Sequence, residues 1–476
     1  MRKADRIMKL VKRTIYTPVF ALLTLGALGG GQPPSQTRTG KPADLEVKVD
    51  AYVRPYLEIK GFSGAILIAS KGRVLLSKGY GMANYELDAP NTPQTKFHLA
   101  SISKTFTAAA IMILEERGLL SVSDPLSKYI PDYPEGDKIA IHHLLIHTSG
   151  IPNVNNFPDY NARSKFPQTL ANIIEMFKNR SLTMKPGERY SYSNSNYNVL
   201  AFIIEKVSGK SYGDFLKENI FDPLGMKDTG HDGAANALIK GRASGYAPVG
   251  PGDLENAPWI DWTIKTGNGS LYSTVEDLYK WDRALYTEKI LKKSALDKMF
   301  TLRVEAAGYG WFIERRLNRK VIRFSGRSPG FQGEIQRYID DDVCVIVLSN
   351  NYSGAASYMI TDLAAMVFGE PYDTASINPG LKIDPRVIDG YLGRYEGGAD
   401  FFIPRASITV EKRDGNLALR WSTGAVGWST PMTESKFYER IFGAAVTFVK
   451  DDKGKVSHLI LSISGSEYRA NKAQSE

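Results

Sequence analysis

Residues 101–118 of the chain read SISKTFTAAAIMILEERG. The apolar run from Thr105 to Glu116 has the length and spacing of a buried helix, and Gly118 marks its end. Ser101 and Lys104 open this helix three residues apart, so we expect them on one face, near the positive end of the helix dipole. A serine hydroxyl needs a base to act as a nucleophile, and a desolvated lysine loses its proton near neutral pH. The alternative is an ordinary surface serine and lysine.

A second group of polar residues lies about ninety positions downstream. Tyr192-Ser193-Asn194 precedes a helical pattern over Ser195–Val207 that ends at Gly209. A tyrosine hydroxyl beside a lysine ammonium has its pKa lowered and relays protons, which predicts this role for Tyr192. An asparagine amide both donates to and accepts from an acyl side chain, which suits Asn194 for substrate binding. The alternative is a polar helix cap.

The two motifs together resemble the serine β-lactamase-like family, which includes class C β-lactamases, D-alanyl-D-alanine carboxypeptidases and related esterases. The resemblance runs over about residues 45–370 and implies an α+β fold, an antiparallel sheet with an inserted helical subdomain. It implies acyl transfer to water without a metal or organic cofactor, on a small-molecule or peptide substrate. Ser101 would be the nucleophile, Lys104 and Tyr192 would move its proton, and Asn194 would orient the acyl group. Four framework segments also look like that family: 123–125, 141–150, 190–197 and 269–278.

The third motif departs from the family, which usually places Lys-Thr-Gly or His-x-Gly on the strand beside the site. The matching residues here are Phe324-Ser325-Gly326, followed by Arg327. Phe324 cannot bind a substrate carboxylate as a lysine would, whereas Arg327 could supply a charge. By analogy with the family strand, the backbone N–H groups of Ser101 and Arg327 would form the oxyanion hole.

Three functions remain open after this departure. An esterase is favoured, because an ester lacks the carboxylate that a β-lactam or a D-Ala-D-Ala peptide presents. A β-lactamase or D-alanyl-D-alanine carboxypeptidase is the first alternative. The second is a catalytically silent protein that binds a peptide or cell-wall fragment, which Phe324 favours and the intact Ser101, Lys104 and Tyr192 oppose.

The amino-acid composition argues against several other classes of protein and of binding site. The chain has 476 residues, 43% of them hydrophobic and 23% charged, which is the balance of a globular protein. Its net charge is +9, but +5 of this lies in residues 1–29, and the other basic residues are scattered, so nucleic-acid binding is not expected. The single cysteine, Cys344, excludes an intramolecular disulfide and a thiolate metal cluster, and we expect it buried. None of the six histidines forms an H-E-x-x-H pair, so no metal site is predicted.

Two G-x-S-x-G strings raise the possibility of an α/β-hydrolase nucleophile elbow. They occupy residues 209–213 and 326–330. Such an elbow must follow a strand and open a helix, with Asp and then His downstream. The first string follows a predicted helix and the second leads into another strand, so neither Ser211 nor Ser328 is expected to be the nucleophile.

The N-terminus has the pattern of a secretory signal peptide. Six basic residues precede and flank the apolar stretch Ile15–Leu28, whose 14 residues are too few to span a bilayer, and Gly29 follows. We predict a signal peptide over residues 1–29 and a secreted or periplasmic protein with no stable membrane span after cleavage. The alternative is a membrane form held by an uncleaved signal-anchor.

Composition shifts predict the domain organisation. Residues 30–42 are a predicted linker, 43–370 the hydrolase domain, 371–385 a second linker and 386–476 a small antiparallel β domain. Hairpin turns at 413–416 and 451–454 support the last assignment, and this region resembles the lipocalin-like β domain often appended to such hydrolases. No oligomeric state follows from the sequence. In the hydrolase domain we expect a helix over 45–59, strands over 62–69, 73–76, 320–324, 333–339 and 343–349, and a helix over 355–368.

Overall fold

The computed structural model describes residues 42–234, 237–372, 377–401, 403, 405–413, 415–463 and 466–473. The predicted signal peptide at 1–29, and the predicted linker at 30–42 except its last residue, lie outside these residues. Within the described ranges no helix combines the length and the apolar character that crossing a membrane requires.

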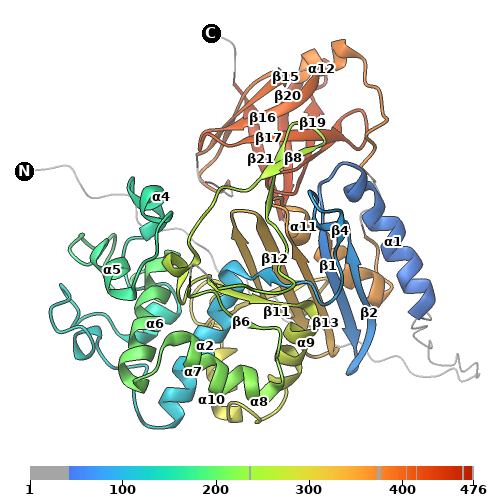
Figure 1. The fold of residues 1–476 in the computed structure, drawn as a ribbon. Helices are drawn as coiled ribbons and strands as arrows, with labels where there is room; N and C mark the ends of the chain where they lie inside the picture. Colours follow the sequence, from blue (N-terminus) through green and yellow to red (C-terminus); the bar gives the residue numbers. More distant parts are fainter. Residues whose placement is uncertain are drawn as a thin grey trace, which may run out of the picture. The chain divides into compact units, whose positions relative to one another are not determined.

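An antiparallel sheet of six strands, in the order β10-β11-β12-β13-β1-β2, forms the centre of the hydrolase region. Strand β1 pairs with β13 from Gly64 opposite Ser349 to Ser70 opposite Val343, so the two ends of the region meet in mid-sheet, as predicted. Figure 1 shows β1 and β13 side by side between the other strands. The strands are β1 (Gly64–Ser70), β2 (Arg73–Tyr80), β10 (Phe312–Arg316), β11 (Arg319–Ser328), β12 (Phe331–Tyr338) and β13 (Val343–Ser349).

The central strands are buried on both faces, which explains their nearly continuous apolar sequences. Alternate side chains of β1 point to opposite sides, so Ile66 and Ile68 join one core cluster and Ala65 and Leu67 another. The first cluster is covered by α1 (Pro42–Glu58) and α11 (Ala355–Phe368) and the second by α2 (Ser103–Glu116) and α9 (Val275–Ala284). Cys344 is fully buried in the second cluster, as expected, and burial raises the pKa of its thiol.

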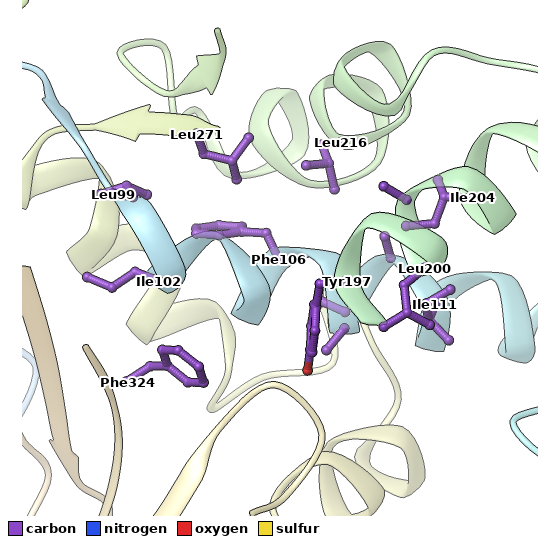
Figure 2. Packing of buried hydrophobic residues seen from close by; sticks show 14 of the residues in the cluster. Leu99, Ile102, Phe106, Ile111, Tyr197, Leu200, Ile204, Leu216, Leu271 and Phe324 are labelled. Carbon is purple, nitrogen blue, oxygen red and sulfur yellow. The ribbon is translucent and has the colours of Figure 1, made fainter. Parts of the chain in front are cut away.

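The predicted helical block lies between the two halves of the sheet in sequence. In Figure 2, Leu200 and Ile204 of α6 lie beside Ile111 of α2, which places α6 over that helix. The remaining helices are α3 (Ile141–Leu145), α4 (Tyr160–Arg163), α5 (Leu170–Glu175), α6 (Asn194–Ser208), α7 (Tyr212–Leu216), α8 (Asp222–Leu224) and α10 (Lys293–Met299). Short strands are β3 (Met82–Asn84), β4 (Ala89–Pro90), β5 (Phe97–His98), β6 (Gly230–His231), β7 (Tyr246–Val249), β8 (Asp253–Asn256) and β9 (Leu271–Ser273).

The C-terminal region is a closed antiparallel barrel of eight strands, which agrees with the predicted small β domain. Its interior is filled by aromatic and branched side chains, among them Trp421, Phe437 and Phe448. The domain boundaries at 370 and 386 stay predictions. Helix α12 (Pro385–Tyr391) precedes the strands β14 (Gly393–Gly397), β15 (Ser407–Arg413), β16 (Asn416–Trp421), β17 (Val426–Pro431), β18 (Lys436–Glu439), β19 (Ala444–Lys450), β20 (Val456–Ile463) and β21 (Ser466–Lys472).

Candidate active site

Ser101 lies on a single 3-10 turn, Ala100–Ile102, that leads into α2. This differs slightly from the expected regular helix, since α2 itself begins at Ser103. Ala100 has a φ of +47°, a left-handed conformation that residues with a side chain rarely adopt. Such strain persists only where the surroundings fix it, and it therefore marks the turn that carries Ser101 as a functional segment.

Lys104 is fully buried and its amino group contacts three oxygen atoms. Nζ lies 3.0 Å from Ser101 Oγ, 2.9 Å from Asn194 Oδ1 and 2.8 Å from the carbonyl oxygen of Asn268. Burial lowers the pKa of Lys104 well below its usual value, and the positive charge of Lys265 lowers it further. A neutral amine donates two hydrogens, which the amide and carbonyl oxygens accept. Its lone pair is then left for the third neighbour, the Ser101 hydroxyl.

Tyr192 contacts the same hydroxyl from a second direction. Its phenol donates to Ser101 Oγ at 3.0 Å, and its ring centre lies 5.1 Å from Lys104 Nζ. The expected lowering of the tyrosine pKa is wrong, because burial raises the pKa of Tyr192 to about 12. The physical reason is that a neutral Lys104 offers no ammonium charge to stabilise a phenolate. Tyr192 is therefore a protonated donor.

His147 holds the segment that carries Tyr192, a role that sequence reasoning missed. The backbone N–H of Ser193 donates to His147 Nδ1 at 3.2 Å, and that of Ser191 donates to the His147 carbonyl oxygen at 2.8 Å. The imidazole also packs 4.4 Å from the Tyr192 ring, centre to centre. Burial lowers the pKa of His147 well below its usual value, so the ring is a neutral acceptor. The only sequence signal was its place within the framework segment 141–150.

Asn194, the first residue of α6, lies between Lys104 and a loop of the helical block. Its Oδ1 accepts from Lys104, its Nδ2 donates to Asn155 Oδ1 at 2.7 Å, and its backbone N–H donates to Asn153 Oδ1 at 3.2 Å. The structure thus brings together Ser101, Lys104 and the Tyr192–Asn194 motif as predicted from the sequence. Asn153 and Asn155 were missed, because no spacing connects residues about forty positions away to this motif.

The strand of the third motif lies directly against the turn that carries Ser101. The pairing of β10 with β11 ends where Phe312 lies opposite Arg323. From Phe324 onward, β11 pairs with β12 on one edge and has no β10 partner on the other. A Cβ added to Gly326 would lie 2.1 Å from the Leu99 carbonyl oxygen and 2.9 Å from the Ser101 nitrogen. Only a glycine allows this approach, which places the backbone of the predicted oxyanion strand beside the backbone of Ser101.

The other third-motif residues lie on both faces of β11. Phe324 is 3% exposed and stacks on Phe312 at a ring separation of 5.0 Å. Figure 2 shows its ring on the side of Ile102, which lies in the 3-10 turn that β11 contacts. Ser325 is half-buried on the opposite face, as alternation along a strand requires. The apolar wall expected at Phe324 is therefore mainly part of the core.

The guanidinium of Arg327 is directed to the barrel. Its Nη2 donates to the Ile441 carbonyl oxygen at 2.6 Å, and the group lies 4.1 Å from the Tyr352 ring centre. Ile441 follows β18 in the barrel. Gly326, the residue before Arg327, is the one that approaches the Ser101 backbone, while the Arg327 side chain is held by a carbonyl and an aromatic face. This arrangement suits a structural role for the side chain better than the carboxylate binding considered from the sequence.

Gly326→Ala is expected to lower kcat by about a hundredfold, because the added methyl overlaps backbone atoms and must displace the Ser101 turn. The matched control is Gly390→Ala, since the new Cβ there meets no heavy atom within 4 Å. Kinetics with a chromogenic ester and thermal unfolding measured on both variants test this. Unchanged activity in Gly326→Ala would contradict the proposed close approach.

A surface cavity of about 700 Å³ lies beyond the end of β11. Its lining includes the buried His98 and Phe331 and the exposed Leu238 and Trp259. His98 stacks on Trp262 at a ring separation of 3.6 Å. None of the predicted site residues lines this cavity, although Pro329 at its edge is only two residues from Arg327.

The two rejected serines have other structural tasks. Ser211 begins α7, where its hydroxyl accepts from the Asp214 backbone N–H at 3.1 Å and caps the helix. Ser328 ends β11 opposite Phe331, so the second G-x-S-x-G string leads into a strand and not into a helix. In the part of the chain that the structure describes, no three His, Cys, Asp or Glu residues are grouped as metal ligands.

Comparison with known proteins gives one consistent result. The family model described as Beta-lactamase matches residues 49–366. Penicillin-binding protein 4* of Bacillus subtilis is 31% identical over 86% of this chain and 94% of its own length. The teichoic acid D-alanine hydrolase of Staphylococcus aureus is 28% identical over 69% of this chain and 80% of its own length.

A solved structure agrees over most of the fold. The octameric penicillin-binding protein homologue from Pyrococcus abyssi matches 90% of this chain and 99% of its own, with 28% identity and a TM-score of 0.63. This match is longer than the span of the family model, so it extends beyond residues 49–366.

Proposed function

Because the chain belongs to the beta-lactamase family and is a serine hydrolase, we propose that it cleaves carboxylic esters through an acyl-enzyme on Ser101. The observation that carries this proposal is the convergence of Lys104 Nζ and the Tyr192 hydroxyl on Ser101 Oγ, each at 3.0 Å. A neutral amine and a protonated phenol supply a base and an acid around one nucleophile.

Acylation uses the base first. As Ser101 Oγ attacks the carbonyl carbon, its proton passes to the lone pair of Lys104, and the carbonyl oxygen becomes an oxyanion. The backbone N–H groups of Ser101 and Arg327 stabilise that charge. When the carbon–oxygen bond to the alcohol breaks, Tyr192 gives its proton to the departing oxygen. Lys104 then returns its proton to the phenolate, which leaves both groups neutral and the acyl group on Ser101.

Deacylation repeats these steps with water. A water molecule takes the place of the alcohol, Lys104 removes its proton, and the resulting hydroxide attacks the carbonyl of the acyl-enzyme. Collapse of the second oxyanion breaks the bond to Ser101 Oγ, which regains its proton from Lys104. The carboxylic acid leaves, and no atom or charge is left over.

Substrate preference follows from the third motif. A β-lactam or a D-Ala-D-Ala peptide brings a carboxylate that needs a cation or hydrogen-bond donor nearby. Phe324 offers neither, and the Arg327 guanidinium is occupied by the Ile441 carbonyl oxygen. These contacts favour an ester over a carboxylate-bearing amide. The penicillin-binding relatives keep a β-lactamase or carboxypeptidase activity as the second candidate.

A substrate panel tests the preference. We expect kcat/KM for p-nitrophenyl esters of short or medium acyl chains to exceed that for nitrocefin, and D-Ala-D-Ala peptides to be poor substrates. Phe324→His, which adds a donor at 324, is expected to shift the ratio toward nitrocefin. Arg327→Ala is expected to leave the ratio unchanged, since its guanidinium is engaged with the barrel. Efficient nitrocefin hydrolysis that is lost in Arg327→Ala would refute the ester preference while leaving Ser101 as the nucleophile.

A further inference from the structure

We infer that Lys265 forms an anion subsite in the acyl side of this active site, so that the preferred acyl group carries a carboxylate or similar negative charge. The inference rests on the proposed serine hydrolase function and specifies its substrate class. Lys265 is not part of any of the three sequence motifs. It ends a single 3-10 turn, Trp262–Lys265, that precedes the loop leading to β9.

Lys265 is a largely buried lysine whose ammonium has no anionic partner among the residues that the structure describes. The residue is 7% exposed. Across the described ranges, its Nζ makes no ion pair within 4 Å and no hydrogen bond, whereas Lys96, Lys206 and Lys280 each contact an acid or a carbonyl oxygen. The nearest acid in sequence, Asp261, is already used, because its Oδ1 accepts from the backbone N–H and hydroxyl of Thr263.

The position of Lys265 relative to the nucleophile follows from three contacts. A Cβ added to Gly269 would lie 3.5 Å from the Ala100 carbonyl carbon and also 3.5 Å from Lys265 Cδ. The backbone N–H groups of Asn268 and Gly269 donate to the Lys265 carbonyl oxygen, at 3.0 and 2.8 Å. This tight turn is the one that presents the Asn268 carbonyl oxygen to Lys104. Lys265 is thus separated from the Ser101 turn by a single glycine.

The other end of the Lys265 side chain reaches the wall that holds Asn194. Its Nζ lies 5.9 Å from the ring centre of Tyr160, the first residue of α4. The residues just before Tyr160 include Asn153 and Asn155, which bind the backbone and the amide of Asn194. Lys265 therefore lies on the side of the site where the acyl group of a bound substrate is expected.

A buried charge without a partner is costly, and a ligand that supplies the opposite charge recovers that cost. A carboxylate on the acyl chain would form a charge-assisted hydrogen bond with the ammonium. An acyl group with its own ammonium, such as a D-alanyl ester, would meet repulsion from Lys265 instead. The subsite consequently predicts discrimination against aminoacyl esters, even though one relative is named for hydrolysis of D-alanine from teichoic acid.

The experiment compares three 4-nitrophenyl esters whose five-carbon acyl chains differ only in charge at the far end. They are the glutarate monoester, the neutral pentanoate and the 5-(trimethylammonio)pentanoate, each corrected for spontaneous hydrolysis. In the wild type, kcat/KM for the glutarate monoester is expected to exceed that for the pentanoate about tenfold, and the cationic ester to be the poorest. In Lys265→Met both differences should disappear, and Lys265→Arg should restore the preference for the anion.

The ratio of kcat/KM between two of these substrates reports on the proposed subsite and does not depend on changes that affect catalysis of all three equally. Loss of the Lys265 charge also affects Lys104, but this changes all three rates together and cancels in the ratio. Lys227→Met, at an exposed lysine, controls for the change in net charge. Hydrolysis of the pentanoate without an anion preference, or a preference that survives in Lys265→Met, would overturn the inference alone. No hydrolysis of any ester would overturn the proposed function together with it.

Discussion

Ser101→Ala is expected to abolish covalent labelling by a fluorophosphonate and to reduce ester turnover by about 10³-fold or more. Both Lys104 and Tyr192 contact Ser101 Oγ. Its removal leaves the base and the acid in place but takes away the nucleophile that they activate. Any residual rate would come from binding and the oxyanion hole. The measurement is stoichiometric labelling followed by steady-state kinetics with p-nitrophenyl esters and nitrocefin.

The controls for this prediction are the two serines in the G-x-S-x-G strings. Ser211→Ala removes a helix cap and is expected to cost about 1 kcal/mol of stability while leaving labelling intact. Ser328, at the end of β11, is a buried residue, and the Ser328→Ala variant should also be labelled. If Ser328→Ala were the variant that lost the label, Ser101 would not be the nucleophile.

Many helices and strands of the fold can be predicted from short-range patterns of apolar and turn-forming residues in the sequence. The helix expected over 355–368 has those bounds in the structure, because an apolar run ends there at Gly369, which adopts the left-handed conformation of a helix end. Five strands of the central sheet are also predicted, since their apolar runs are bounded by turns, whereas the edge strand β10 (Phe312–Arg316), with three charged residues among five, is not. Ser101 is the exception, because a strained Ala100 replaces the first turn of the expected helix with a 3-10 turn.

The site is predicted less completely than the fold. Ser101, Lys104 and the Tyr192–Asn194 motif are recognisable because each has a local spacing that chemistry requires. His147, Asn155 and Lys265 have no such spacing, and tertiary packing alone brings them to the site. The reacting groups can be identified from the sequence. The residues that position these groups, or that place a charge beside them, depend on which loops pack together in the fold.

The direction of a pKa shift also depends on packing. Sequence reasoning treated Lys104 as neutral when acting as a base, yet as an ammonium when lowering the pKa of Tyr192. The geometry favours the first, since Lys104 is fully buried, two oxygen atoms are placed to accept from it, and it forms no ion pair with an acid among the described residues. With the lysine neutral, burial outweighs the opposing effect of the hydrogen bond with Ser101 and raises the pKa of the Tyr192 phenol. Base and acid are therefore separate residues, and Tyr192→Phe removes the acid without removing the base.

Lys104→Met is expected to reduce kcat by about 10³-fold or more, comparable to loss of the nucleophile, because the two act as one unit. The pH dependence of kcat/KM in the wild type should reflect the protonation of Lys104. As pH falls through the pKa of Lys104, the amine gains a proton, loses its lone pair and can no longer accept from Ser101. Because burial lowers that pKa well below its usual value, the loss of kcat/KM on the acidic side lies far below the ordinary lysine value. An acidic limb near pH 10 would contradict a neutral base.

The same substitution predicts a pH-dependent change in stability. Lys104 has a lower pKa in the folded protein than the value of about 10.4 in an unfolded chain, so between these two values the unfolded state binds more protons. The free energy of unfolding of the wild type therefore rises with pH in this window, by at most about 1.4 kcal/mol per pH unit from this group. Lys104→Met lacks this contribution, while His98 and His147, also buried, titrate in both proteins. The variant should thus gain stability relative to the wild type as pH falls from about 10, and urea unfolding at several pH values measures the difference. A difference that is constant with pH would mean that Lys104 stays protonated in the fold, and the base would then have to be sought elsewhere.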